Sequence, residues 1–253
     1  MGGATGAPVL YEKHDAVAVL VLNRPHVLNA YDVGMRDALY EHLRAIRDDP
    51  EVRCVVLRGN GPAFSTGGDL LEFGSTPSPV AARRVRWQRD VWGLLCGVRV
   101  PTLAAVHGYV VGGGFEMALL CDLCLAADDA RFAYPETGLG MIPGVGGTQT
   151  TPRLVGIGRA LDLILRGRAL TADEARRWGL VTRVVPGHQL VDEAMREAAI
   201  FAALDRAAVA ALKEAVTRGL DLPLVRGLAL ERRLARRMAR QARADRRDAH
   251  GCS

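Results

Sequence analysis

Short β-branched segments alternate with longer segments of helical periodicity along most of the chain, and this order restricts the fold class more than any other feature. Strand patterns occur at residues 9–11, 16–22 and 52–58. Between the second and the third, Asp32 is a suitable N-cap for a helix. The apolar residues that recur there at helical spacing are Met35, Leu39, Leu43 and Ile46. Strands and helices in alternation are typical of the α/β class.

The same alternation continues downstream. A helical stretch is expected at about 79–98, and apolar strands are expected at 102–110, 121–127 and 181–185. Between the last two strands, Thr171 and Glu174 form a capping box that predicts the start of a short helix.

After the last expected strand, the pattern is helical almost to the end of the chain. No linker, repeat or low-complexity segment separates this part from the rest. We therefore predict an α/β core domain over residues 1–195 and a helical C-terminal part over residues 196–253, which ends in an arginine-rich tail.

The hydropathy pattern and the N-terminal sequence indicate a soluble, cytoplasmic protein. The longest apolar run, residues 16–22, is far shorter than the roughly 18 residues that a membrane-spanning helix needs. The N-terminus has neither a basic stretch nor a long apolar one, so no secretory signal is expected. The five cysteines are an odd number, which favours reduced thiols over a disulfide framework.

The positive charge is unevenly distributed. The formal net charge is +5, and residues 226–253 carry all of the excess, which leaves the rest of the chain nearly neutral. A second basic segment, residues 83–92, has Trp87 and Trp92 among its arginines. A nucleic-acid surface is one interpretation of that segment. We expect instead a solvated arginine face with the tryptophans packed inward, because the body as a whole is not basic.

The common nucleotide and hydrolase motifs are absent. The chain has no complete G-x-G-x-x-G fingerprint, no Walker lysine and no G-x-S-x-G elbow. Cys121 and Cys124 form a C-x-x-C, but residues three apart on a strand point to opposite faces and a second ligand pair is missing. We expect buried thiols there and no metal site. His107 is expected to be a core or turn residue.

Two glycine-bearing turns are the strongest candidates for a functional site. Gly67 and Gly68 precede Asp69, and Gly112 and Gly113 precede a helical segment. Glycines at a helix start let a ligand approach free backbone N–H groups, where the helix dipole favours negative charge. Two such groups from separate turns would form an oxyanion hole that stabilises an enolate or a tetrahedral oxyanion.

Two glutamates lie next to these turns in the sequence. Glu116 falls in the first turn of the helix that follows the second glycine turn, and Glu136 follows Pro135. Facing carboxylates suit general acid and base catalysis on a water molecule. From spacing alone, an alternative stays open: Glu116 stabilises the helix dipole and Glu136 is solvated.

Five motifs follow one another along residues 9–225. They are NRPHVLNA at 23–30, AFSTGGDL at 63–70, AAVHGYVVGGGFEMALLCDLCLAAD at 104–128, FAYPETGLGMIPGVGGTQ at 132–149 and ALTADEARRWGLVTRVVP at 169–186. In this order and spacing, the motifs resemble those of the crotonase superfamily, the enoyl-CoA hydratases and isomerases.

The resemblance implies a fold of repeated ββα turns wound into a superhelix, with a helical C-terminal part that builds a trimer, often a dimer of trimers. It implies an acyl-CoA substrate, of which coenzyme A is a part, and no metal or redox cofactor. The thioester carbonyl would accept hydrogen bonds from the N–H groups of Gly68 and Gly113. The residues that would bind the substrate are His26, Val27, Leu28, Ala30, Thr66, Gly68, Asp69, Leu70, Gly112, Gly113, Pro135, Leu139 and Gly144.

Carboxylates at the positions of Glu116 and Glu136 mark hydratases within that family. By resemblance, Glu116 would deprotonate a water for attack on Cβ, and Glu136 would deliver a proton to Cα. The predicted function is therefore hydration of a trans-2-enoyl-CoA to a 3-hydroxyacyl-CoA. An isomerase, hydrolase or decarboxylase that uses the same enolate is left open, and so is a non-catalytic crotonase-fold protein that binds RNA through its arginine tail.

The chain departs from the family pattern where relatives carry lysines near the CoA phosphates. Those places hold His26, Pro62 and Leu71, and the usual phenylalanine followed by a lysine-rich tail is missing. Arginines are then the candidates for contacts to CoA phosphates or to another subunit, and nucleic acid is not the expected partner. These candidates are Arg240, Arg243, Arg246 and Arg247.

Overall fold

The computed structural model describes residues 6–72 and 89–250, with the side chains of 243–250 excepted. The chain forms two compact units, one up to Phe201 and one from Ala202 onward. Each unit is described by itself below.

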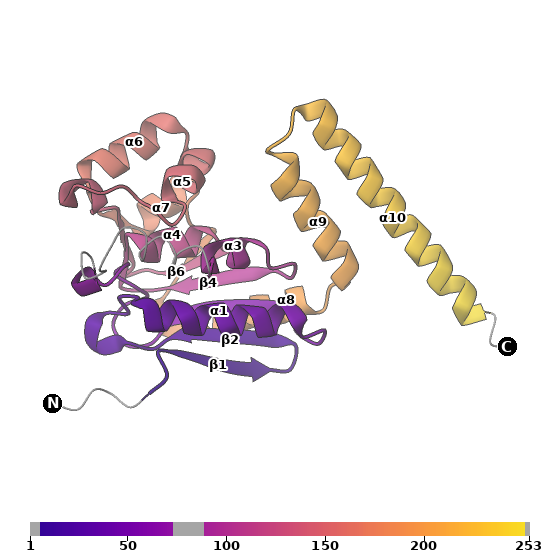
Figure 1. Ribbon diagram of the computed structural model, residues 1–253, viewed down its shortest axis with the longest axis horizontal. Coiled ribbons are helices and arrows are strands. Elements are labelled where there is room, and N and C mark those ends of the chain that lie inside the picture. Colours follow the sequence, from indigo (N-terminus) through magenta and orange to yellow (C-terminus); the bar gives the residue numbers. More distant parts are fainter. Residues whose placement is uncertain (1–5, 73–88, 251–253) are drawn as a thin grey trace. The chain divides into compact units, whose positions relative to one another are not determined.

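The first unit is built on a six-stranded sheet with the strand order β1-β2-β3-β4-β6-β9 (Figure 1). The strands span Val9–His14, Val17–Leu22, Cys54–Gly59, Thr102–Val106, Leu123–Ala127 and Arg183–Val185. β1 and β2 form an antiparallel hairpin, and every later pairing in this sheet is parallel. All six residues of β2 are buried, as expected of a parallel sheet covered on both faces.

A smaller sheet has the strand order β5-β7-β8. Its strands span Tyr109–Val111, Arg131–Ala133 and Leu170–Thr171. β5 directly follows β4, and β7 directly follows β6, so the chain passes twice from the larger sheet to the smaller one. Isolated bridges between Ser65 and Val110 and between Tyr31 and Gly68 continue this layer. The layer therefore brings both glycine turns to one edge of the unit.

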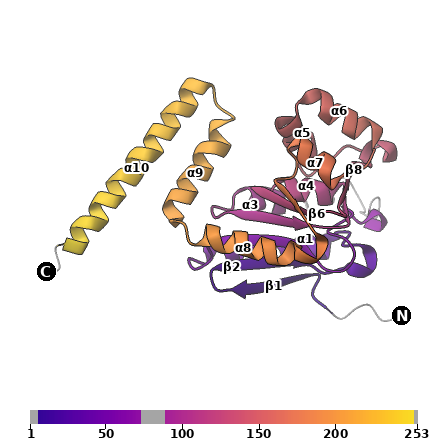
Figure 2. The ribbon, with the colours of Figure 1, turned by 180° about the vertical axis from the view of Figure 1, so that it is seen from behind.

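Helices complete the repeats, and several of them, such as α1 and α4, pack on the larger sheet. They are α1 (Val33–Asp48), α3 (Val91–Cys96), α4 (Gly113–Leu119), α5 (Gly147–Val155), α6 (Ile157–Arg166), α7 (Ala172–Trp178) and α8 (Leu190–Ala202). Short 3-10 turns are η1 (Pro25–Val27), η2 (Leu70–Glu72), η3 (Glu136–Leu139) and η4 (Gly187–Gln189). Figures 1 and 2 show α1 and α8 on opposite faces of the sheet. The succession β4-β5-α4 and β6-β7-α5 is the repeated ββα unit, so the predicted fold class is confirmed.

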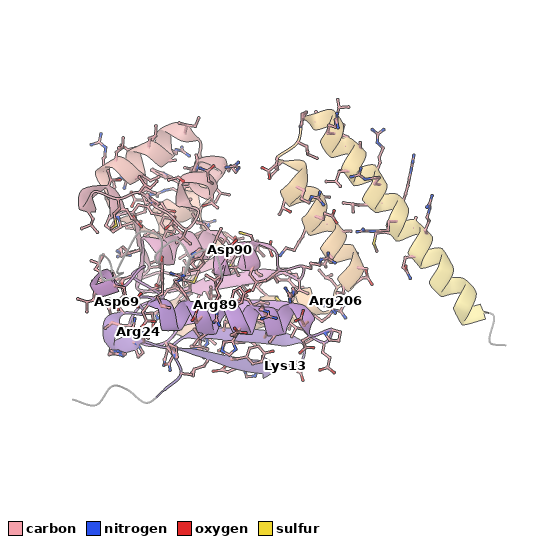
Figure 3. The ribbon with its side chains drawn as sticks, viewed as in Figure 1. Lys13, Arg24, Asp69, Arg89, Asp90 and Arg206 are labelled. Carbon is pink, nitrogen blue, oxygen red and sulfur yellow. The ribbon has the colours of Figure 1, made fainter. Side chains whose placement is uncertain are left out.

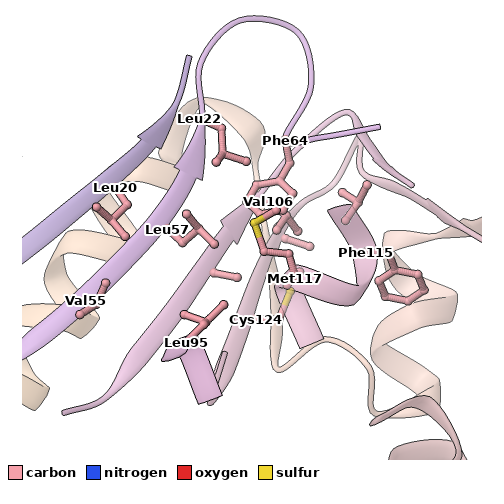
Figure 4. Close-up of a cluster of buried hydrophobic side chains, with 14 of the residues drawn as sticks. Leu20, Leu22, Val55, Leu57, Phe64, Leu95, Val106, Phe115, Met117 and Cys124 are labelled. Carbon is pink, nitrogen blue, oxygen red and sulfur yellow. The ribbon is translucent and has the colours of Figure 1, made fainter. Parts of the chain in front are cut away.

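The core lies between the larger sheet and its covering helices. Figure 4 shows Leu20, Leu57 and Val106 on neighbouring strands, with Val106 beside Met117 from α4. These side chains are at most 2% exposed. Dense apolar packing of this kind fixes the strands, and thereby the backbone turns at their ends.

The second unit consists of α9 (Arg206–Gly219) and α10 (Leu224–His250), which form a helical hairpin. Its own core is small and contains Ala211, Leu230 and Leu234. Glu214 of α9 pairs with Arg237 of α10 at 3.6 Å. Arg240 lies beside other arginines on the surface of α10, and the side chains of Arg243, Arg246 and Arg247 lie outside the described residues.

Several local expectations are met. Asp32 caps α1 by accepting the Met35 N–H at 2.7 Å, and the four apolar residues at helical spacing are buried. The capping box of Thr171 and Glu174 opens α7, and Gly179 caps its C-terminal end.

The boundary between the two units differs from the predicted one. The division predicted at residue 195 falls inside α8, whereas the compact units divide at residue 201. The buried residues Leu190, Ala194 and Ala198 anchor α8 in the first unit.

The basic segment 83–92 is described only from Arg89 onward. Arg89 pairs with Asp37 at 3.3 Å and with Glu41 at 3.4 Å. These surface ion pairs agree with the solvated arginine face expected here. Trp92 packs edge-on against Tyr31, with ring centroids 5.4 Å apart. Trp87 and the arginines before it lie outside the described residues, and so does the first half of the helix expected at 79–98. The second half contains α3.

Candidate active site

Arg24 fastens the loop after β2 to the first glycine turn. Its guanidinium pairs with the Asp69 carboxylate at 3.1 Å, and both residues are labelled in Figure 3. In the same loop the fully buried Asn29 donates a hydrogen bond to the Ala63 carbonyl at 2.8 Å. These contacts hold the loop against the segment that carries Gly67 and Gly68.

The backbone of Tyr31 pairs with the residues on either side of Gly68. The Tyr31 N–H donates to the Gly67 carbonyl at 2.8 Å, and the Asp69 N–H donates to the Tyr31 carbonyl at 2.9 Å. Within residues 6–72 and 89–250, no acceptor takes the Gly68 N–H. The turn therefore presents this group to a ligand.

The second glycine turn touches the first. Gly112 adopts a φ of 54°, which favours glycine, and its N–H donates to the Ala133 carbonyl at 2.9 Å. A Cβ atom at Gly67 would lie 2.9 Å from the Gly113 nitrogen. The Gly113 N–H is the first of α4 and has no acceptor in the described part of the chain. Two N–H groups without an acceptor in the described part of the chain, those of Gly68 and Gly113, thus lie on turns that touch, as an oxyanion hole requires.

Glu116 is held by the start of α5. The residue is 1% exposed, and its Oε1 accepts the N–H groups of Val145, Gly146 and Gly147 at 2.8, 2.9 and 2.7 Å. Burial raises the pKa of the carboxyl group, while these N–H groups act in the opposite direction. Because all three bonds go to Oε1, Oε2 is the oxygen left for a bound water.

Glu136 occupies the first position of η3 and lies against Gly112. Its Oε1 would be 2.6 Å from a Cβ atom at Gly112, and its Oε2 is buried without a hydrogen-bond partner among the described residues. Burial raises the pKa of Glu136 to about 7; the residue's own backbone N–H acts in the opposite direction, and the nearby Glu116 raises the pKa further. The Glu116 N–H donates to the Gly112 carbonyl at 3.0 Å. Both glutamates therefore adjoin the same glycine, next to the two free N–H groups.

Most of the other predicted substrate-binding residues lie around this cluster. The Leu28 carbonyl accepts the Thr66 N–H at 3.1 Å. Ala30 receives a hydrogen bond from Arg24, and Pro135 lies 3.8 Å from a Cβ atom placed at Gly112. The Gly144 N–H is among the groups that lower the pKa of Glu116.

The side chains of the remaining predicted residues make none of the contacts that define this cluster. His26, Leu70 and Leu139 are exposed, and Val27 is half-buried beside His26 in η1. None of the four takes part in the hydrogen bonds just described. Their role as substrate-binding residues stays a prediction.

Sequence reasoning missed Arg24, Tyr31, Tyr134 and Thr151. A Cβ atom at Gly113 would overlap the Tyr31 hydroxyl, so this ring packs directly against Gly113. The only signal for Tyr31 and Tyr134 is position, because Tyr31 follows the NRPHVLNA motif and Tyr134 precedes Pro135.

The cysteines and histidines of the described residues show no cluster typical of a second site. Cys124 is buried in β6 and Cys121 is half-buried before it, both as reduced thiols. His107 lies in the turn between β4 and β5, where its Nε2 is 2.8 Å from the Gly61 carbonyl oxygen. Of the residues that the structure describes, no three His, Cys, Asp or Glu side chains cluster as metal ligands would. None of the described helices combines the length and apolar character needed to cross a membrane.

Free N–H groups beside one buried and one half-buried carboxylate are the groups expected of an enzyme site that stabilises an oxyanion and transfers protons. The family model for enoyl-CoA hydratase/isomerase matches residues 12–250. The chain therefore belongs to the enoyl-CoA hydratase/isomerase family, within the crotonase superfamily.

Named relatives and solved structures agree with this family. The chain is 40% identical to a probable enoyl-CoA hydratase, echA8, of Mycobacterium bovis, over 89% of this chain and 87% of that protein. It is 35% identical to a crotonyl-CoA hydratase of Syntrophomonas wolfei, over 88% of this chain and 86% of that protein. The crystal structure of an enoyl-CoA hydratase from Bacillus anthracis superposes with a TM-score of 0.86 at 34% identity, covering 90% of each chain.

Proposed function

We propose that the protein hydrates a trans-2-enoyl-CoA to a 3-hydroxyacyl-CoA. The observation that carries the proposal is the contrast between two neighbouring glutamates. Glu116 accepts three backbone N–H groups that stabilise its carboxylate, whereas Glu136 has an unpaired buried oxygen and a pKa raised to about 7. One carboxylate suited to take a proton and one carboxyl suited to give a proton are what addition of water requires.

The proposed reaction begins with the thioester carbonyl oxygen accepting the N–H groups of Gly68 and Gly113. Glu116 takes a proton from a water molecule, and the water oxygen forms a bond to Cβ. The Cα–Cβ π electrons move onto the thioester as an enolate, whose negative oxygen the two N–H groups stabilise. Glu136 then donates its proton to Cα. Transfer of the proton gained by Glu116 back to Glu136, through solvent, restores the starting state.

The pH dependence of kcat/KM for crotonyl-CoA tests these roles. The rate should fall on the alkaline side with a midpoint at about pH 7, because Glu136 loses the proton that it must donate. It should fall again at acidic pH, because Glu116 gains a proton and can no longer act as a base. A profile that stays flat through pH 7 into the alkaline range would contradict the assignment of Glu136 as the acid.

The reaction product distinguishes a hydratase from an isomerase that uses the same enolate. Hydration removes the enone absorbance and adds one water, whereas isomerisation moves the double bond and leaves the mass unchanged. The two carboxylates and two N–H groups supply every proton transfer and charge contact of hydration, so we propose that no metal or redox cofactor takes part.

The trimer or hexamer that the family resemblance implies is proposed on the basis of the second unit. Its helices carry large apolar side chains that are exposed within that unit, including Leu212, Leu220 and Leu224 at 62%, 80% and 77%. Apolar surface of this extent is typical of an interface between subunits. Sedimentation should give the mass of a trimer or a hexamer, and a monomer would contradict the proposal. The cytoplasmic location stays a prediction.

The arginine tail is proposed to serve CoA phosphates or subunit contacts. Arg233, Arg236, Arg237 and Arg240 lie together on α10, where they form a basic surface. The RNA-binding alternative requires retention of RNA that weakens with salt, together with no turnover of any enoyl-CoA.

A further inference from the structure

Tyr134 connects the elements that carry the two glutamates. It is fully buried, and its ring stacks on Phe115 with centroids 4.7 Å apart and planes inclined by 23°. Phe115 directly precedes Glu116 on α4, and Tyr134 directly precedes Pro135 and Glu136. Tyr134 therefore packs against the helix that carries Glu116, and it lies two residues before Glu136 in the chain.

The hydroxyl group of Tyr134 extends this connection to α5. It forms a hydrogen bond of 2.9 Å with the hydroxyl of Thr151, and both residues are fully buried. Thr151 lies one helical turn beyond Gly147 on α5. A Cβ atom at Gly147 would be 2.9 Å from the Tyr134 hydroxyl and 3.0 Å from Cγ of Glu116. The Tyr134 hydroxyl thus contacts the helical turn whose N–H groups bind the Glu116 carboxylate.

We propose that Tyr134 is a positioning residue, whose hydrogen bond to Thr151 fixes the start of α5 against Glu116 and so sets the placement of the two glutamates. The proposal rests on the proposed function for its kinetic consequences. Its structural part, the placement of the N–H groups on Glu116, does not depend on which substrate is used.

The proposal predicts a change in the charge state of Glu116 when the hydrogen bond is lost. If the start of α5 shifts, the three N–H groups stabilise the carboxylate less, so the pKa of Glu116 rises further. The ionisable side chains coupled to Glu116 are Glu136 on η3 and the phenol of Tyr134 itself. Burial and both glutamates raise the pKa of the phenol, which stays protonated, so replacing Tyr134 by Phe removes a hydrogen bond but no charge.

The kinetic experiment compares Tyr134→Phe, Thr151→Val and the double variant in hydration of crotonyl-CoA. We expect kcat to fall by about tenfold to a hundredfold, since small displacements of catalytic groups have effects of this size, with KM changed by less than about twofold. The acidic limb of the kcat profile should move to higher pH. The double variant should lose no more than the worse single variant, because both substitutions break one bond.

Tyr11→Phe is the matched control. Tyr11 is a half-buried tyrosine on β1 that stacks on His42, away from the site. Its variant should keep the wild-type kcat and the wild-type acidic and alkaline limbs of the pH profile. A lower melting temperature for Tyr134→Phe with unchanged kcat and an unmoved acidic limb would show a purely structural role and overturn the proposal. Additive losses in the double variant would also overturn it.

A measurement without substrate separates this proposal from the proposed function. The titration of Glu116 can be followed by the infrared carboxyl band that disappears in Glu116→Gln, recorded in the Tyr134→Phe and Tyr11→Phe backgrounds. A titration midpoint raised only by Tyr134→Phe supports the positioning role even if crotonyl-CoA is not turned over. An unchanged midpoint overturns it even if the wild-type protein is an active hydratase.

Discussion

Glu116→Gln should lower kcat for hydration of crotonyl-CoA by about a thousandfold, while the protein stays folded. The size of the loss follows from removing a positioned general base, which contributes roughly a hundredfold to ten-thousandfold. The amide oxygen of Gln can still accept the N–H groups of Val145, Gly146 and Gly147, which now bind Oε1 of Glu116. The variant therefore keeps the geometry of the site and loses only the ability to take a proton.

The free energy of unfolding should confirm that the loss is chemical. We expect a change of less than about 2 kcal/mol in urea denaturation, because a neutral amide replaces a carboxylate in the same hydrogen bonds. Glu41→Gln is the control, since Glu41 is a half-exposed glutamate on α1 whose partners are Arg89 and Arg44. A Glu116→Gln variant with kcat within tenfold of wild type would rule out Glu116 as the base.

Glu136→Gln should lower kcat by about a hundredfold to a thousandfold, because the proton donor to Cα is lost. The residual activity should no longer fall with a midpoint at about pH 7, since the group responsible for that limb is gone. Activity close to wild type, or an unchanged alkaline limb, would contradict the role of Glu136.

The stability of Glu136→Gln should differ from wild type in a pH-dependent way. The folded protein raises the pKa of Glu136 from 4.5 to about 7, so folding disfavours the charged form. The resulting destabilisation of the wild type grows between these two pH values and is constant above them. Relative to wild type, the variant should thus gain stability from pH 4.5 to 7, which urea denaturation at several pH values will measure.

The body of the fold could be predicted because its signals are local or periodic. Met35, Leu39, Leu43 and Ile46 bury one face of α1, and Thr171 with Glu174 fixes the start of α7 within four residues. Such patterns are readable in one sequence because helix and strand repeats have fixed periods. The glycine turns were recognisable for a similar reason, since few residues other than glycine adopt the φ of Gly67 and Gly112.

The sequence pattern did not predict the helices α5 and α6. α5 begins at Gly147 and contains Pro152, two residues that normally argue against a helix, and its first turn is stabilised by the contact with Glu116. That contact joins residues thirty-one positions apart, so no local pattern reports it. Tertiary packing decides the structure here.

The chemistry of the site also depends on distant contacts. Sequence reasoning placed Glu116 and Glu136 near the glycine turns, but it could not assign different roles from spacing. The difference arises because the start of α5 supplies N–H groups to Glu116, whereas Gly112 offers Glu136 a close contact without a hydrogen bond. Roles of this kind require the folded backbone.

The most direct test is the product formed from crotonyl-CoA in water enriched in oxygen-18. If the two glutamates activate one water, the enone absorbance should disappear. The product should be a 3-hydroxybutyryl-CoA that carries one solvent oxygen on Cβ. Both signals should be strongly reduced in Glu116→Gln and in Glu136→Gln. A product with a shifted double bond and no added oxygen, or no turnover of enoyl-CoA substrates of any chain length, would contradict the account.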